Sequence, residues 1–165
     1  MVNKTLIHVL LIFGLTTCIS LVSLWLWISF HQKDKSVSGI YVSELLITVS
    51  DERYHTDYCK LLKKAVGNDP VSIKKLVLLE FYGGSSYDHG SVIVELIALL
   101  GEDTFLKAIS SISYQQKKHL AAMIRAGLEF GNNPKLQDLS FEEAFPHIFD
   151  YVTLDSINVQ RFNRE

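Results

Sequence analysis

The sequence predicts an all-α protein in which a single N-terminal transmembrane helix precedes a compact helical domain. Residues Val9–Phe30 are 22 consecutive positions without a formal charge, rich in Leu, Ile, Val, Phe and Trp. Beyond them, apolar residues recur mostly at helical spacing, and Ser, Asp, Pro and Gly stand where helices begin and end. We expect an anchor with short flanks over 1–35 and a helical domain over 36–165. The domain is either a bundle or a HEAT-like stack of helical hairpins, because no repeated residue pattern separates the two.

The uncharged run is long enough to cross a bilayer as a helix, because a helix of about 20 residues spans about 30 Å. Trp25 and Trp27 suit the aromatic belt at one interface. A cleavable secretory signal is the alternative, but its apolar part is normally roughly 7 to 15 residues. The small-x-small site Ser36–Ser38 also lies beyond a charged segment. A residue larger than Gly or Ala precedes Cys18, which disfavours lipidation there. The lipid bilayer is therefore an expected partner through Val9–Phe30.

The orientation of the anchor is not decided by its flanking charges. Lys4 lies on one side, and residues 33–35, with two Lys and one Asp, lie on the other. The positive-inside rule gives nearly equal counts. A short basic N-terminal tail before a long C-terminal domain is the usual layout of a signal anchor, so we expect a single-pass protein with an extracytoplasmic domain.

Small hydroxyl residues line one face of the anchor. Thr16, Ser20 and Ser23 recur at helical spacing, and such faces allow close approach of two membrane helices. Self-association through the anchor is one interpretation. The other is that these side chains bond to their own backbone, as Ser and Thr commonly do in membrane helices.

The first part of the domain is ambiguous between strand and helix. Gly39–Val49 contains β-branched residues that suit a strand, but we favour a short helix. A helix is then expected from the cap residue Ser50 to Gly67. Asp69-Pro70 places an N-cap before a proline at the first helical position, which predicts a second helix to about Tyr82.

The middle of the domain contains the expected core helix. From Asp88 or His89 to Leu100 the chain is apolar on nearly every side, which indicates burial by several neighbours. Gly101 ends this helix, and a short helix over Glu102–Ser111 follows. The expected core residues are Leu96, Ile97, Leu100 and Ile124.

Two capping boxes predict the last helices. Ser113–Gln116 opens a long helix that ends at Phe130, before a Gly stop. Ser140–Glu143 starts a final helix toward Tyr151, which Pro146 bends or splits. The tail after this helix remains unassigned.

Charge and cysteine content exclude several kinds of site. From Ser36 on the chain has 13 Lys and Arg against 17 Asp and Glu, a net charge of −4. This acidity argues against nucleic acid as a partner, because phosphate binding needs a basic face. Cys59 is the one cysteine of the domain, so neither an internal disulfide nor a paired-thiolate zinc site is possible there. The His residues lack metal-ligand spacing, and we expect neither metal nor cofactor.

One segment concentrates polar groups at the start of the core helix. We predict that it forms a loop and that five of its residues make a binding surface: Ser85, Ser86, Tyr87, Asp88 and His89. Tyrosine is enriched at binding hot spots, and free N–H groups at a helix start can hold an anion. The alternative is an ordinary turn with Asp88 as N-cap. A phosphate-binding loop would also carry a Lys, which is missing here.

The chain contains no recognisable catalytic motif. We therefore predict a membrane-anchored, non-catalytic protein-interaction module with an unidentified protein partner. In size, acidity and expected helical content, though not in any motif, the chain resembles bacterial immunity proteins, which neutralise a toxin by binding it. The alternative is an enzyme whose site is assembled from residues that no motif marks.

Overall fold

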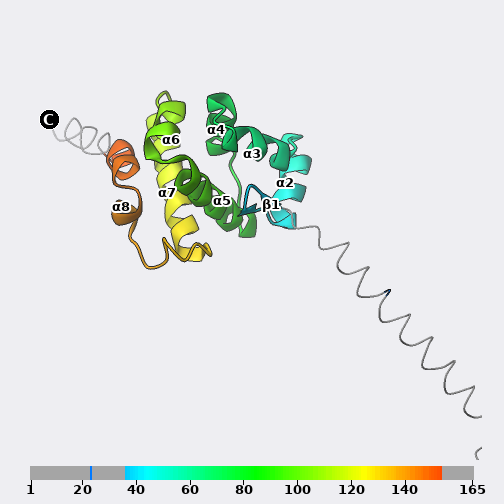
Figure 1. Ribbon diagram of the computed structural model, residues 1–165. Coiled ribbons are helices and arrows are strands. Elements are labelled where there is room, and N and C mark those ends of the chain that lie inside the picture. The colour runs from blue at the N-terminus through cyan, green and yellow to red at the C-terminus, as the bar shows by residue number, and fades with distance from the viewer. Residues whose placement is uncertain (1–22, 24–35, 154–165) are drawn as a thin grey trace, which may run out of the picture. The chain divides into compact units, whose positions relative to one another are not determined.

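The computed structural model describes Ser23 and residues 36–153 (Figure 1). The predicted anchor, apart from Ser23, and the tail after Thr153 lie outside the described residues, so the span, its orientation and its self-association stay predictions. Within the described part, no helix combines the length and the apolar character needed to cross a membrane.

The described domain is a mostly helical bundle, which confirms the all-α prediction. It opens with a small antiparallel hairpin in which β1 (Ser36–Val37) pairs with β2 (Ile40–Tyr41). The labelled helices are α2 (Glu44–Tyr54), α3 (Tyr58–Val66), α4 (Pro70–Val77), α5 (Gly84–Leu100), α6 (Glu102–Ile109), α7 (Tyr114–Phe130) and α8 (Phe141–Ala144). Residues 146–153 are also helical.

The preference for helix over Gly39–Val49 was wrong in its first part. The chain is extended to Tyr41, and α2 begins only after Ser43, whose Oγ accepts a hydrogen bond from the Leu46 N–H at 3.1 Å. Ser43 is therefore the N-cap, because its side chain satisfies a donor that the first turn of a helix leaves unpaired. Of the β-branched residues before it, Ile40 lies in β2 and Val42 follows the strand.

The expected helix from Ser50 to Gly67 is in fact two helices. Ser50 lies buried inside α2, and its hydroxyl donates to the Thr56 carbonyl at 3.0 Å. His55 adopts a left-handed conformation with φ 47°, which ends α2. Asp57 then caps α3 by accepting from the Lys60 N–H at 2.9 Å. Ser50 was predicted to be an N-cap because serine is common at helix starts, but it lies inside α2 and Asp57 caps the next helix.

The second predicted helix ends early, at Val77 instead of Tyr82. The following residues are not helical, yet Leu79 and Phe81 are buried. The Glu80 N–H donates to the Tyr54 hydroxyl at 3.1 Å, and this hydroxyl donates in turn to the Glu80 carbonyl. A side chain of α2 thus supplies the backbone partners that a longer helix would have supplied.

The core is built on the crossing of α5 and α7, which lie side by side in Figure 1. Leu96, Ile97 and Ile124 are at most 1% exposed, as predicted, whereas Leu100 is only half-buried. The helices approach closely at two glycines. A Cβ atom added to Gly127 would lie 2.2 Å from the carbonyl oxygen of Gly90, so neither position has room for a larger residue.

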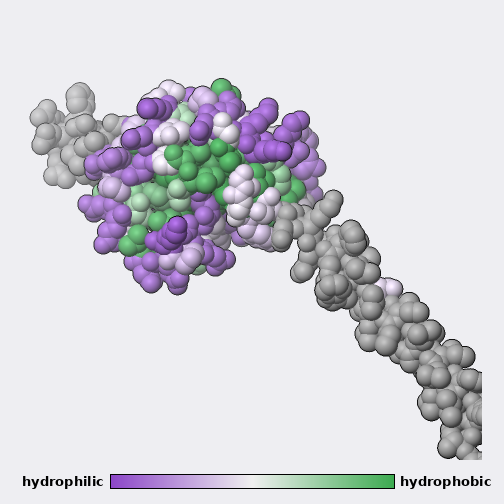
Figure 2. Space-filling model, in the orientation of Figure 1, coloured by the Kyte–Doolittle hydropathy of each residue, from purple (hydrophilic) through white to green (hydrophobic). Residues whose placement is uncertain are grey.

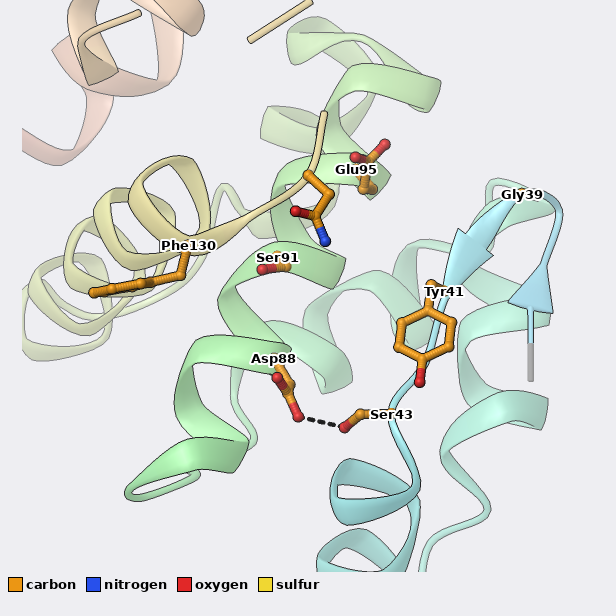
Figure 3. A pocket seen from close by; sticks show the side chains of 8 residues that line it. Gly39, Tyr41, Ser43, Asp88, Ser91, Glu95 and Phe130 are labelled. Atoms are coloured by element: carbon orange, nitrogen blue, oxygen red, sulfur yellow. Dashed lines mark hydrogen bonds between the residues drawn. The ribbon is translucent and has the colours of Figure 1, made fainter. Parts of the chain in front are cut away.

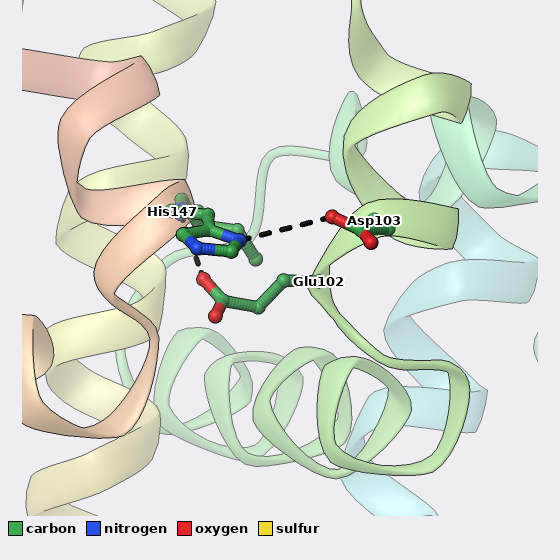
Figure 4. Close-up of polar contacts among 4 residues, drawn as sticks. Glu102, Asp103 and His147 are labelled. Atoms are coloured by element: carbon green, nitrogen blue, oxygen red, sulfur yellow. Dashed lines mark hydrogen bonds and ion pairs between the residues drawn. The ribbon is translucent and has the colours of Figure 1, made fainter.

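The C-terminal elements follow the predicted punctuation. Both capping boxes are present, at Ser113 and Ser140. The last helix splits at Phe145, just before Pro146, because proline cannot donate the hydrogen bond that would continue it. Its second half bonds to α6, where the carboxylate of Glu102 (Figure 4) accepts a hydrogen bond from the Ile148 N–H at 2.8 Å.

A weaker contact lies beside this attachment. His147 Nδ1 lies 3.7 Å from a carboxylate oxygen of Asp103 (Figure 4), but both side chains are mostly exposed. Exposed pairs of this kind stabilise little. On the face drawn in Figure 2, hydrophobic residues gather across the middle of the described domain and hydrophilic residues border them.

Candidate functional site

The predicted loop before the core helix is itself helical, because α5 begins at Gly84 and not at Asp88. Gly83 precedes the helix with φ 61° and ψ −140°, a conformation that favours glycine. The Ser86 N–H and hydroxyl both donate to the Gly83 carbonyl, at 3.1 and 2.7 Å. Since consecutive helical residues point in different directions, the five predicted residues do not share one surface.

Two of the five belong to the interior. Ser85 is 3% exposed, and its hydroxyl donates to the Tyr82 carbonyl at 2.9 Å. His89 is completely buried: its Nε2 lies 3.1 Å from the Leu76 carbonyl and its Nδ1 lies 2.7 Å from the Tyr58 hydroxyl. A carbonyl can only accept, so Nε2 carries the proton and Nδ1 accepts from Tyr58.

The environment of His89 keeps its imidazole neutral. Burial lowers the pKa of His89 to about 3, because the charged form would lose its hydration. Burial also raises the pKa of Tyr58 well above its ordinary value, so the phenol stays a donor. The Tyr58–His89 pair is therefore a satisfied polar element of the core and takes no part in a surface site.

The side chain of Asp88 lines a groove between the hairpin, α5 and the end of α7 (Figure 3). The groove has a volume of about 290 Å³. Its lining residues come from three separate parts of the chain: Gly39, Tyr41 and Ser43; Asp88, Ser91 and Glu95; Phe130 and Asn132. We call this feature the Asp88 groove. It lies at the N-terminal half of α5, next to the predicted segment.

The two carboxylates of the Asp88 groove are held by neutral donors. Asp88 accepts from the Ser43 hydroxyl, and Glu95 accepts from the Asn133 side-chain amide at 3.0 Å. Both acidic residues are half-buried. Among residues 36–153, no Lys or Arg forms an ion pair with either of them. The groove therefore carries negative charge that the described part of the chain does not neutralise.

Exposed aromatic rings accompany these carboxylates. Tyr41 is 68% exposed and Phe130 is 54% exposed. Tyr87, one of the predicted residues, packs on Phe130 with ring centroids 4.6 Å apart. Of the five predicted residues, Asp88 therefore lines the groove and Tyr87 lies at its edge.

The sequence did not indicate the other residues of the groove, because they are far apart along the chain. One pattern was visible: Asp88, Ser91 and Glu95 recur at spacings of three and four residues, which places them on one helix face. The helix expected from Asp88 to Leu100 already contained this pattern. Tyr41, Phe130 and Asn132 gave no comparable sign.

The Asp88 groove is small and is lined by polar and aromatic side chains. The described residues hold no group of three or more His, Cys, Asp or Glu side chains that could bind a metal ion. The volume of the groove is at the lower end of the range for small-molecule sites, about 300 to 1,000 Å³.

Comparisons with known proteins give no family. No protein-family model matches the chain, and no curated protein or solved structure matches it either.

Proposed function

We propose that this protein is a non-catalytic protein-binding module held at a membrane, and that the Asp88 groove is its contact surface. The observation that carries this proposal is the combination of a concave site, carboxylates without a cationic partner in the described domain, and exposed aromatic rings beside them. Aromatic residues are enriched at protein interfaces and dominate their binding energy. A binding protein of the immunity type would use such a surface to occupy its target.

The contacts of the groove's hydroxyl groups support binding over catalysis. Ser43 accepts from the Leu46 N–H and donates to Asp88. Ser91 donates to the Tyr87 carbonyl at 3.1 Å. Here one hydroxyl is a helix cap and the other bonds to its own helix, so both act in the fold.

The membrane part of the proposal rests on the composition of Val9–Phe30. An uncharged run of this length is expected to insert as a single-pass helix. The full chain should then stay with the membrane fraction in high salt and in alkaline carbonate, since insertion of a whole span is effectively irreversible. Recovery of a soluble mature chain beginning near Gly39 would contradict the anchor.

In-cell photo-crosslinking tests the contact surface. A photoreactive phenylalanine analogue replaces Tyr41 or Phe130 in the full chain, in the cells that naturally produce it. Val71, which is 73% exposed and does not line the groove, is the matched control position. We expect a discrete protein adduct from the two groove positions and none from the control. Absence of an adduct, or the same adducts from all three positions, would contradict the proposal.

A further inference from the structure

We infer that the Asp88 groove binds a cationic side chain, Lys or Arg, presented by the partner protein. This inference rests on the proposed function and adds the chemistry of the partner. It combines the size of the groove, its two carboxylates, which no described Lys or Arg neutralises, and the exposure of its aromatic rings.

The size of the groove favours one inserted side chain. Its volume of about 290 Å³ lies at the lower limit for sites that enclose whole small molecules. Figure 3 shows Asp88, Ser91 and Glu95 along α5, with Tyr41 on the strand across from them. A long, unbranched side chain can enter such a space while its backbone remains in the partner.

The charge of the groove favours a cation. A carboxylate offers about four lone-pair sites. The described hydrogen bonds use one neutral donor on Asp88 and one on Glu95, so both carboxylates can accept further hydrogen bonds. These donors also fix the two carboxylates in place. Complementary charge from a partner would compensate two half-buried acidic groups, whereas an anionic ligand would be repelled.

The aromatic rings give an independent indication. Five aromatic rings elsewhere in the described domain have a Lys or Arg of the same chain over them, whereas others, such as the buried ring of Phe105, have none. These five rings are Tyr54, Tyr82, Tyr114, Phe141 and Tyr151. The guanidinium of Arg53, for example, lies 4.7 Å from the centre of the Tyr82 ring. No described Lys or Arg covers Tyr41, Tyr87 or Phe130 in this way. A cation from a partner would find both carboxylates together with exposed aromatic rings that no described Lys or Arg contacts, an arrangement that strengthens binding of Lys and Arg.

Peptide titration of the isotopically labelled full chain in lipid nanodiscs tests the inference. The probe is a short acetylated peptide with one Lys between apolar residues, and matched peptides carry Gln or Glu instead. The reporters are the amide resonances of Ser43 and Ser91 and the side-chain amide of Asn132, which all line the groove. We expect saturable shifts with the Lys peptide that weaken as ionic strength rises to about 0.15 M.

Charge removal without loss of shape is the decisive variant. Asp88→Asn with Glu95→Gln keeps a hydrogen-bond acceptor at both positions and removes both charges. This double variant should weaken binding of the Lys peptide roughly tenfold. The matched control, Asp51→Asn with Glu52→Gln, removes two charges from exposed positions of α2 and should leave binding unchanged.

Three results would overturn the inference. They are equal binding of the Gln and Lys peptides, unchanged binding of the Lys peptide by the double variant, and saturation by ethanolamine phosphate without any response to the peptide. The last result would assign the groove to a lipid headgroup. A photo-crosslinked partner together with a negative titration would leave the proposed function standing and reject only the cation. A positive titration without any adduct would show that the groove binds a cation but would contradict the proposed protein partner.

Discussion

Replacing Gly127 with Ala should destabilise the domain, although alanine is the better helix former. An added Cβ atom would lie 2.2 Å from the Gly90 oxygen, 2.4 Å from the Gly90 carbonyl carbon and 2.7 Å from a methyl group of Val94. Carbon atoms that do not share a bond prefer separations of about 3.5 to 4.0 Å. Two of the obstructing atoms are backbone, so no side-chain rotation relieves the clash, and α5 and α7 must move apart.

The expected loss follows from two opposing effects. Alanine in place of glycine inside a helix normally stabilises by about 1 kcal/mol. Overpacking a tight contact costs about 1 to 3 kcal/mol, and more where the neighbours cannot move. Because the clash involves backbone of the central helix, we place its cost above this range and expect a net loss of about 2 kcal/mol or more.

Urea denaturation of the full chain in mild detergent, followed by circular dichroism, measures this loss. Ala122→Gly is the control: it lies on the exposed side of α7, and should lose only about 0.5 to 1 kcal/mol through helix propensity. Gly90→Ala tests the same contact from α5, where the added atom would lie 2.5 Å from the Met123 carbonyl oxygen. An unchanged or raised stability of Gly127→Ala would refute the close crossing.

Three further predictions test the core, the buried polar pair and the edge of the groove. Leu96→Ala should cost about 2 to 5 kcal/mol in the same denaturation assay, because Leu96 is fully buried, and a loss below about 1 kcal/mol would reject its place in the core. Since the pKa of His89 is about 3 in the folded domain and near 6.5 when exposed, stability should be full above about pH 6.5 and about 2 kcal/mol lower at pH 5. His89→Gln, though less stable, should lose that part of the pH dependence, and an unchanged profile would reject the neutral buried imidazole. Tyr87→Ala should weaken adduct formation from Phe130 with little effect on melting, whereas Asp88→Ala should lower stability by about 0.5 to 2 kcal/mol through loss of its bond to Ser43. Adduct formation unaffected by Tyr87→Ala would confine the contact surface to the groove lining.

The candidate site shows how far local patterns reach. Tyr87 and Asp88 were predicted to bind because they are an aromatic and a polar residue near two glycines. Asp88 lines the groove, and Tyr87 packs on Phe130 at its edge. His89 was predicted to bind on the same grounds, but it lies in the core. Polar residue type alone could not separate them, because the direction of each side chain depends on where α5 begins.

Helix ends that carry a local capping signal could be predicted from the sequence alone. The proline after Asp69 and the capping boxes at Ser113 and Ser140 all mark the ends that the structure has. These signals are local, since the cap and the backbone groups it satisfies lie within one turn. The uncharged run Val9–Phe30 is equally local, and it predicts an anchor without reference to the rest of the chain.

Tertiary structure decided the features that depend on distant partners. The chain is no longer helical after Val77, and the backbone of Glu80 bonds to the Tyr54 hydroxyl from α2. The Asp88 groove exists because the hairpin and the end of α7 meet the same face of α5. Such contacts join residues tens of positions apart, and their free energy comes from packing, which helical periodicity and cap residues do not encode.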